Sequence, residues 1–507
     1  MKKVLLSSAV PFALVLVVLL AGSTGPLGPN PQTRPLPPRP LLSGDSSVGG
    51  PTWARTYGKF FGSADKEQDW CYGSELDADG GLILTGSADT FHLTSDLVVL
   101  KIDAAGEIDW DFVYDADPNT DCSNAGNAVA RTLDGGCLVV GEVGTRSSTD
   151  TDWAALVIKL GPPREPPDER STPSHHYGYY LPQAVPEWIR SYRLTSQEKE
   201  SSTASVVRQT ADGGFLVGGR TYDPAEPFDW IMKLDPNGQP LWHESLGVVF
   251  MSSMITTWDG GFVVLSNAHG QTQLLKFDSE GRIRWARSYD KPDFPCGGPA
   301  VTDGTAIAST SEDGFILAGF SLCWEDGESF NWICRLDGAG RIIWCKGGTG
   351  FVSSILLTSD GGHLLAVDNG LVKIDPSGSV GWVRGFARGG LDTLRLYPIW
   401  AFQRSEGGYA IAGKAFPPGT PARFMAMRLD PNALIDSPCG IETTGSLTLR
   451  DTRLRSVAAT GYAPVANSAR VSTLGYVPYP RPCEVTTVCG PSASHGAFRQ
   501  REKGVKR

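Results

Sequence analysis

The sequence predicts an all-β chain that folds as a seven-bladed β-propeller, and three patterns in its 507 residues support this prediction. An acidic residue followed by glycine precedes a short apolar segment seven times, at Asp79, Asp134, Asp212, Asp259, Asp313, Asp360 and Glu406. A Trp-centred segment also occurs seven times, at Trp53, Trp110, Trp188, Trp242, Trp285, Trp344 and Trp382. In the third unit, residues 204–243, four short apolar or alternating runs are separated by Gly, Asp and Pro, which is typical of strands joined by hairpins.

Each unit is therefore expected to contain four strands, a to d. Asp-Gly suits the a–b hairpin because glycine supplies the positive φ angle of a tight turn, and Asp-x-x-Gly suits the c–d hairpin. The a–b and c–d turns must share one end of the blades, the turn end, while the b–c and d–a connections share the other, the loop end. The acidic turn residues on the two sides of the b–c connection are 23 residues apart in the third unit but 15 in the sixth. Variable loops on a rigid scaffold usually carry function, so any ligand site is expected at the loop end.

The two ends of the repeat array complement each other. The last unit has a strand c at residues 424–430 but no Trp strand after it, whereas residues 53–58 form a Trp strand with no a, b or c before it. We therefore expect residues 53–58 to pair with residues 424–430 and to close the last blade. The Trp side chains, Trp242, Trp285 and Trp344 among them, are expected to be largely buried between blades rather than to form a carbohydrate platform.

Two repeat motifs resemble known propellers. The pattern Lys-h-Asp-x-x-Gly-x-h-x-Trp (h is apolar), seen at residues 233–242 and 276–285, resembles the repeat of quinoprotein-like (PQQ-like) propellers. Thr-x-Asp-Gly-Gly, seen at residues 358–362, resembles a large group of secreted bacterial and archaeal propeller repeat proteins. The resemblance covers about residues 51–437. It implies the fold and little about function, because most members of that group are uncharacterised. The sequence lacks the adjacent Cys pair that quinoprotein dehydrogenases use near their cofactor, so no bound quinone is expected.

The regions outside the repeats indicate export. Residues 1–23 are typical of a signal peptide, with Lys2 and Lys3 before an apolar run, and a signal anchor is the alternative. Residues 24–50 form a Pro-rich linker, residues 51–437 the propeller, and residues 438–507 a separate Ser/Thr-rich extension with a basic tail. The chain is expected to be secreted or at the cell surface, monomeric, and without membrane contact beyond the signal segment. A net charge of −10 argues against nucleic acid as a partner.

Ten cysteines in an exported chain predict disulfides. Cys296, in a d–a loop, and Cys323, in the b–c loop of the same blade, lie at the same end and are the predicted pair. Cys334 and Cys345 flank one hairpin. The turn is expected to place Cys334 opposite Trp344, which would turn Cys345 to the other side, so no bond is expected between these two cysteines.

One acidic loop has calcium-like spacing. Asp115, Asp117, Asn119 and Asp121 place oxygen ligands at alternating positions, as calcium loops do. The loop lacks glycine at position six, and Gly126 stands at position twelve where such loops have glutamate. We interpret it as a solvated acidic loop, with calcium as the alternative; no other cofactor is expected.

The sequence identifies no catalytic residue, because it contains no G-x-S-x-G, P-loop or H-E-x-x-H motif. The candidate ligand-binding residues are Trp324, Glu325 and Asp326, in the b–c loop of the fifth blade. The first hypothesis is a non-catalytic propeller that binds a protein or polysaccharide through its loop end. The alternatives are a polysaccharide hydrolase or lyase with carboxylates at the mouth of the axial channel, and a structural surface protein on a Pro-rich stalk.

Overall fold

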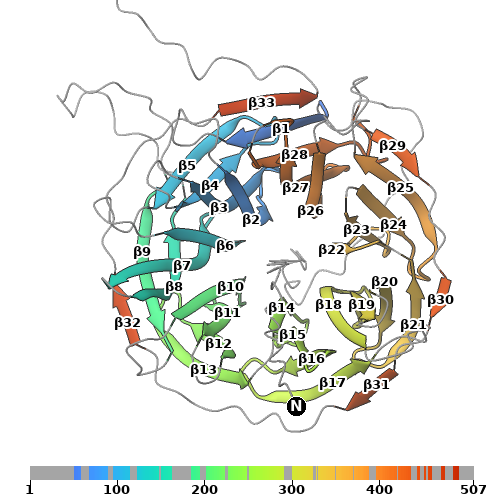
Figure 1. Ribbon diagram of the computed structural model, residues 1–507, viewed down its shortest axis with the longest axis horizontal. Helices are drawn as coiled ribbons and strands as arrows, with labels where there is room; N and C mark the ends of the chain where they lie inside the picture. The colour runs from blue at the N-terminus through green and yellow to red at the C-terminus, as the bar shows by residue number, and fades with distance from the viewer. Residues whose placement is uncertain are drawn as a thin grey trace, which may run out of the picture.

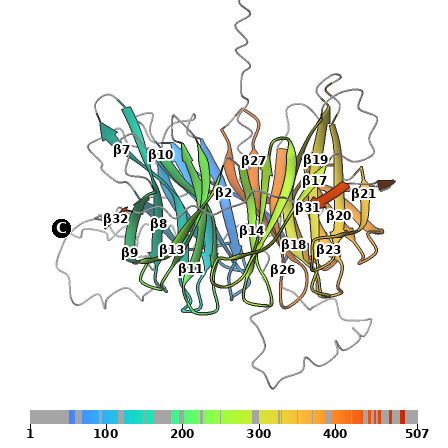
Figure 2. The ribbon, with the colours of Figure 1, turned by 90° about the horizontal axis from the view of Figure 1, so that it is seen from below.

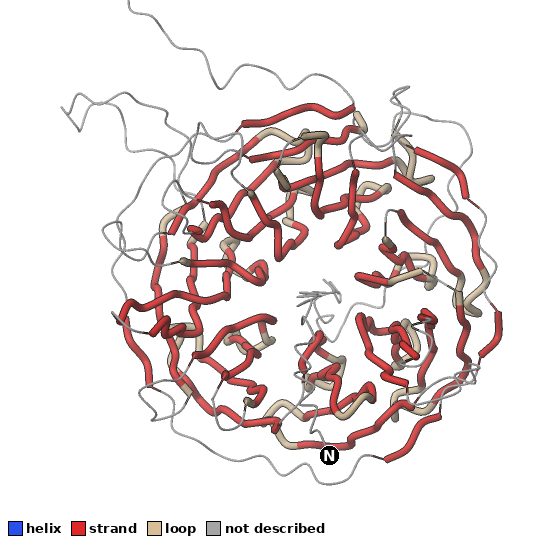
Figure 3. Tube along the Cα trace, in the orientation of Figure 1, coloured by secondary structure: helices blue, strands red, loops and turns tan. Residues whose placement is uncertain are grey.

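The computed structural model describes part of the chain. Within residues 51–435 it omits 59–67, 90–94, 115–122, 148–149, 163–183, 195–200, 223–226, 248–249, 291–299, 324–326, 328, 349, 369, 387–394 and 420. Beyond residue 435 it describes five strands between residues 442 and 489. The described residues form strands and turns without a helix, and so include no helix that could span a membrane (Figure 3).

Seven sheets stand around a common axis, as Figure 1 shows, so the predicted seven-bladed propeller is confirmed. Blade 1 contains β2 (Asp69–Leu76), β3 (Leu82–Asp89), β4 (Ser95–Ile102) and β5 (Ile108–Tyr114). Blade 2 contains β6 (Asn124–Arg131), β7 (Cys137–Ser147), β8 (Asp150–Leu160) and β9 (Pro186–Arg193). Blade 3 contains β10 (Ser201–Gln209), β11 (Phe215–Tyr222), β12 (Phe228–Leu234) and β13 (Pro240–Gly247). Blade 4 contains β14 (Phe250–Thr256), β15 (Phe262–Ala268), β16 (Gln271–Phe277) and β17 (Ile283–Asp290).

The remaining blades follow the same plan. Blade 5 contains β18 (Ala300–Ser309), β19 (Phe315–Cys323), β20 (Ser329–Leu336) and β21 (Ile342–Gly347). Blade 6 contains β22 (Val352–Leu357), β23 (His363–Val367), β24 (Gly370–Ile374) and β25 (Val380–Phe386). Blade 7 contains β26 (Arg395–Gln403), β27 (Tyr409–Phe416), β28 (Arg423–Leu429) and β1 (Trp53–Gly58). Strands b and c are apolar runs, such as the fully buried residues 97–100 of β4, because neighbouring blades cover both faces of each sheet.

The N-terminal strand closes the ring as predicted. β1 pairs antiparallel with β28, with Trp53 opposite Arg428 and Tyr57 opposite Phe424. Trp53 and Tyr57 are buried. Closure joins the two ends of the propeller in one sheet, so no strand of blade 7 is missing.

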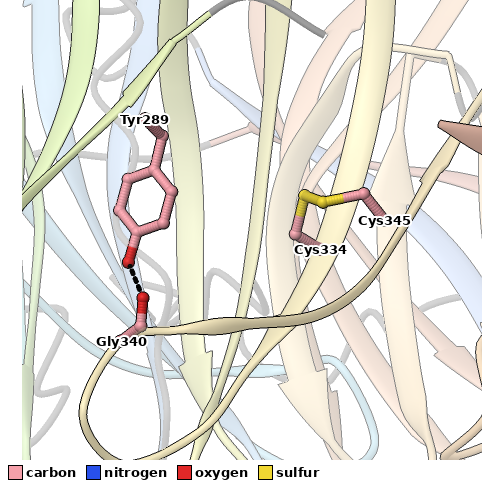
Figure 4. Close-up of a disulfide and its surroundings, with 4 residues drawn as sticks. All are labelled: Tyr289, Cys334, Gly340 and Cys345. Atoms are coloured by element: carbon pink, nitrogen blue, oxygen red, sulfur yellow. Dashed lines mark hydrogen bonds between the residues drawn. A yellow bond between two sulfur atoms is a disulfide. The ribbon is translucent and has the colours of Figure 1, made fainter. Parts of the chain in front are cut away.

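In five places the Trp of strand d covers the c–d turn of the next blade. A Cβ atom on Gly281 would come within 2.9 Å of the Trp242 ring, and the Gly238, Gly340 and Gly378 turns meet Trp188, Trp285 and Trp344 in the same way. A tyrosine further along three of these strands donates to the same turn, as Tyr289 does to the Gly340 carbonyl at 2.6 Å (Figure 4). The Trp residues are therefore inter-blade packing elements. Trp242, Trp285 and Trp344 are half-buried rather than largely buried, whereas Trp53 and Trp110 at the same position are buried.

One ion pair repeats in all seven blades at the turn end. A Lys or Arg of strand c reaches the acidic residue of the a–b turn, and its amine or guanidinium lies 2.5–3.3 Å from the carboxylate. The pairs are Lys101–Asp79, Lys159–Asp134, Lys233–Asp212, Lys276–Asp259, Arg335–Glu312, Lys373–Asp360 and Arg428–Glu406. The pairs give the acidic turn residues a structural role.

The structure corrects the disulfide prediction for one pair. Cys334 and Cys345 lie opposite each other on β20 and β21 and are joined by a disulfide (Figure 4). The prediction placed Cys334 opposite Trp344, but Trp344 faces Arg335, because a β-bulge between Arg335 and Leu336 adds one residue to β21. Cys323 is also disulfide-bonded. Cys296 lies outside the described residues, so its pairing with Cys323 stays a prediction.

The five strands of the C-terminal region form the outermost strands of five blades. β29 (Glu442–Gly445) pairs with β25, β30 (Arg450–Thr452) with β21, and β31 (Arg455–Ala458) with β17. β32 (Arg470–Thr473) pairs with β9 and β33 (Glu484–Cys489) with β1. These five strands, the C-terminal belt, visit blades 6, 5, 4, 2 and 7 and lie around the outside of the ring (Figure 1). A backbone that adds one strand to an open sheet edge needs no repeat motif, so a search for repeats does not find these strands.

Candidate functional site

The innermost strands share an irregularity near the loop end. In all seven blades the pairing of strand a with strand b shifts by one residue, which is the mark of a β-bulge. The bulged residues are Tyr72, Asn127, Ser205, Ser252, Thr305, Ser353 and Ile399. Five of them are small and polar. Blade 1 departs from this pattern by placing a tyrosine at this point beside the axis.

The bulge lies next to a variable position of the repeat. The sixth residue after the last glycine of each a–b turn is Ser87, Glu142, Arg220, Asn267, Phe320, Asp368 or Lys414 in blades 1 to 7. We call these seven residues the variable ring. Six of them stand near the loop end of strand b or just beyond it, and Glu142 stands midway along the longer β7, whereas the turn end repeats a single ion pair. In Figure 2, which shows the blades from the side, the long β7 projects at the loop end.

Five members of the variable ring contact the innermost strand of the next blade or the residue before it. Lys414 lies against Trp70 and Tyr72, and Arg220 against Phe250. Glu142 is hydrogen-bonded to Thr203, Asn267 pairs with the backbone of Gly304, and the Phe320 and Phe351 rings lie 5.9 Å apart. The ring therefore joins successive blades around the axis, through two cation–π contacts, two hydrogen-bonded contacts and one aromatic pair.

Aromatic side chains gather beside this ring between blades 7 and 1. The Phe416 ring packs edge-on against Trp70 at 6.1 Å and against Tyr397 at 5.4 Å. The Lys414 ammonium lies 4.9 Å from the centroid of the Trp70 ring and 5.0 Å from that of the Tyr72 ring. Trp70, Tyr72 and Lys414 are all partly exposed. A half-exposed indole with a cation at its face offers both an apolar surface and a hydrogen-bond donor.

A carboxylate in blade 2 acts on the tyrosines on both sides of it. Burial raises the pKa of Glu142, and the hydrogen bond with Thr203 offsets only part of this. Burial also raises the pKa of Tyr72 and of Tyr222, and the charge of Glu142 adds to the rise in both. Blades 1, 2 and 3 thus place a carboxyl group between two phenols at the loop end, where proton donors and acceptors can face a ligand.

Blade 3 holds an ion pair beneath an exposed aromatic surface. The Arg220 Nε atom lies 3.6 Å from the buried carboxylate of Asp229, and its guanidinium carbon lies 3.6 Å from the centroid of the Phe250 ring. Asp229 also accepts a short hydrogen bond from the Met251 N–H. Tyr222 and Phe250 remain 47% and 59% exposed, so the surface above the ion pair is open to a ligand.

The titration of Asp229 leads to a prediction about stability. Burial raises the pKa of Asp229 to about 7, and Arg220 and the Met251 N–H offset it only in part. The folded protein then holds a proton that the unfolded chain releases from about pH 4 upward. This contribution to stability is therefore present below pH 4 and is lost as the pH rises through 7, with a slope of at most about 1.4 kcal/mol per pH unit.

Asp229→Asn is expected to flatten this part of the profile when urea midpoints are measured between pH 4.5 and 8. A residual slope should remain, because burial raises the pKa of Glu75, near the turn end of β2, to about 7 as well. Parallel profiles for the wild-type protein and Asp229→Asn would contradict the prediction.

The residues singled out from the sequence lie elsewhere. Trp324, Glu325 and Asp326 are outside the described residues, as are Asp115, Asp117, Asn119 and Asp121, so the ligand-binding and calcium assignments stay predictions. Within the described part of the chain, no group of three or more His, Cys, Asp or Glu residues could hold a metal ion. The sequence reasoning missed the variable ring. Aligning the seven units on their Asp-Gly turns would have found it, because one column then contains seven different residues.

The comparisons with known proteins bear on the fold alone. No family model and no curated protein matches the chain. The resemblance to quinoprotein-like and secreted repeat propellers is therefore not confirmed by a family match. The polysaccharide lyase Uly1 is 10% identical over 70% of this chain and 89% of its own, with a TM-score of 0.42. The Dos1 propeller is 9% identical over 71% and 84%, with a TM-score of 0.40. A protein of unknown function from Bacteroides caccae is 16% identical over 56% and 89%, with a TM-score of 0.32. Similarities of this size carry no argument about activity.

Proposed function

We propose that this protein is an extracytoplasmic, non-catalytic propeller that binds a polysaccharide at the variable ring. The observation that carries the proposal is the contrast between the two ends of the repeat. Seven blades repeat one Lys/Arg–Asp/Glu pair at the turn end but carry seven different residues at one position near the loop end. A scaffold needs its turns to be alike, whereas a ligand site needs different groups at different points.

The chemistry around the ring favours a saccharide over a protein partner. Partly exposed aromatic rings, Trp70, Tyr72, Tyr222 and Phe250, alternate with Glu142, Arg220 and Lys414 along blades 7, 1, 2, 3 and 4. Sugar rings present apolar faces that stack on aromatic side chains and hydroxyl groups that bond to charged ones.

The cysteines support the extracytoplasmic part of the proposal. The Cys334–Cys345 disulfide and a second one at Cys323 are stable in an oxidising environment and are rare in reducing cytosol. Together with the predicted signal peptide in residues 1–23, they support export of the chain to the outside of the cell.

A glycan array with the purified protein tests the proposal, followed by titration of the saccharides that bind. Trp70→Ala and Glu142→Gln are each expected to weaken binding about tenfold or more, since a buried aromatic or charged contact is commonly worth over 1.4 kcal/mol. The Ala variants of Trp324, Glu325 and Asp326 are expected to weaken it as well, because that loop joins strands b and c.

Trp258→Ala is the matched control. Trp258 lies in the a–b turn of blade 4 and is 52% exposed, so it offers an indole at the turn end. Its removal is expected to leave saccharide binding unchanged. Weakened binding in Trp258→Ala with unchanged binding in Trp70→Ala would place the site at the opposite end. Binding of a protein and of no saccharide would reject the polysaccharide.

A second candidate function is polysaccharide cleavage, and one observation favours it. The site combines a carboxyl group whose pKa is raised, Glu142, with an amine whose pKa burial lowers, Lys414. Such shifts suit proton transfer near neutral pH. Release of new reducing ends from a bound polysaccharide, abolished in Glu142→Gln, would favour the enzyme over the binding protein.

A further inference from the structure

We propose that the site recognises an acidic saccharide, one that carries a carboxylate or a sulfate, and that Lys414 binds the acidic group while Trp70 stacks on the sugar ring. This inference rests on the proposed function, because it names the ligand class of the same site. It is carried by the surroundings of Lys414, a member of the variable ring on β27.

Lys414 is a cation with aromatic rings but no anion around it. Its ammonium lies over the Trp70 and Tyr72 rings, and within the described residues no carboxylate lies within ion-pair distance of it. Burial lowers its pKa, and the only partner that opposes this is the Cys71 thiol in the next blade. A partly buried ammonium without a counter-charge is unfavourable unless something else supplies the anion.

Other lysines of the propeller show what the fold does when the charge is structural. Lys101, Lys159, Lys233, Lys276 and Lys373 each pair with an aspartate of the a–b turn at 2.5–2.9 Å. In the variable ring itself, Arg220 has Asp229 as its partner. Lys414 is the exception among these cations, so its missing anion is best supplied by a ligand.

The neighbouring blade is built to receive the rest of a sugar. Blade 1 replaces the small bulge residue of five other blades with Tyr72, whose hydroxyl is hydrogen-bonded to Ser87, and sets Trp70 on the other side of Cys71. The Phe416 ring packs against Trp70 at a steep angle and helps to hold it in place. Two rings held at fixed angles beside an ammonium match the apolar face and the acidic substituent of a uronate or a sulfated sugar.

The carboxyl groups of the site determine how the ligand is oriented. Glu142, in blade 2 and so on the side away from blade 7, acts electrostatically on Tyr72, as does Asp89 of blade 1. They would repel an acidic group and would accept hydrogen bonds from hydroxyl groups instead. The acidic substituent is therefore confined to the Lys414 side of Tyr72. With a chain net charge of −10, such binding depends on this local cation and not on a general attraction for polyanions.

Calorimetric titration with matched acidic and neutral probes tests the inference. The carboxylate probes are oligogalacturonate, alginate and hyaluronan oligosaccharides, with fully methyl-esterified oligogalacturonate as the neutral match. The sulfate probe is dextran sulfate, with dextran as its neutral match. The wild-type protein is expected to prefer the acidic member of at least one pair by about tenfold or more, the usual effect of one charge-assisted contact.

Three variants locate that preference. Lys414→Gln is expected to lower affinity for the acidic probe about tenfold to a hundredfold and to leave the neutral match unchanged, whereas Lys414→Arg should retain most of the affinity. Lys346→Gln is the control, because Lys346 lies over the Trp344 ring, 5.9 Å from its centroid, on the outer strand β21. Circular dichroism and thermal unfolding confirm that each variant is folded.

The outcomes separate the inference from the proposed function. Equal loss of acidic and neutral binding in Lys414→Gln, or no loss in either, overturns the role of Lys414. Binding of neutral saccharides alone, weakened in Trp70→Ala, overturns the acidic ligand and leaves the proposed function standing. Failure of every saccharide to bind overturns both.

Discussion

A protein that lacks residues 51–58 is expected not to form a stable propeller. β1 supplies the fourth strand of blade 7 and also joins that blade to blade 1. Trp53 Nε1 donates to the Ala104 carbonyl at 3.2 Å, and Tyr57 Oη donates to the Gly106 carbonyl at 2.8 Å. Loss of the buried Trp side chain alone costs about 3–5 kcal/mol, a large part of the 5–15 kcal/mol that stabilises a typical protein.

Urea unfolding, followed by circular dichroism, measures this effect. The truncated protein is expected to be unfolded or to lose most of its transition, and Trp53→Ala in the full chain should lower the unfolding free energy by about 3–5 kcal/mol. Trp188→Ala is the matched control, since Trp188 is a half-buried member of the same series within the ring. It should cost less. An unchanged midpoint for the truncated protein would show that β1 does not close the ring.

The fold could be predicted from the sequence because it is local and repeated. Each turn motif sets the pairing of the strands beside it, so the Trp and Lys residues of strands c and d fall at the same place in every blade, as in the pairing of Lys233 with Trp242 and Lys276 with Trp285. Ring closure followed from counting strands in the first and last units. The first argument needs only neighbours along the chain, and the second only a comparison of its two end units.

The features that could not be predicted depend on single residues or on contacts between residues far apart in the sequence. One bulged residue changed the partner of Cys334 from Trp344 to Cys345 and so reversed the disulfide prediction. Lys414 and Trp70 meet only because β1 brings blades 7 and 1 together, and neither residue belongs to a motif. The variable ring is defined by the lack of a repeated residue, so a search for recurring motifs passes over it.

Removal of the C-terminal belt is the second large effect. A chain that stops after residue 437 is expected to keep the propeller, because seven four-stranded sheets remain. Its unfolding free energy should be lower by about 5 kcal/mol. This is the sum of many lost backbone hydrogen bonds, worth about 0.5–1.5 kcal/mol each, minus the entropy cost of ordering the belt. The outer edges of β9, β17, β21, β25 and β1 lose their partners. Open edges pair with other chains, so the truncated protein should also associate.

Two truncations of different length test whether the C-terminal belt stabilises the blades or is an independent tail. A chain that stops after residue 480 loses β33 and bares only β1, whereas a stop after residue 437 bares all five edges. Thermal unfolding should therefore show a small loss for the first and a large loss for the second, and size-exclusion chromatography should show more association in the second. Equal melting temperatures for the two truncated chains and the full protein would mean that the belt strands contribute no stability, and pairing with the blades would then have no energetic role.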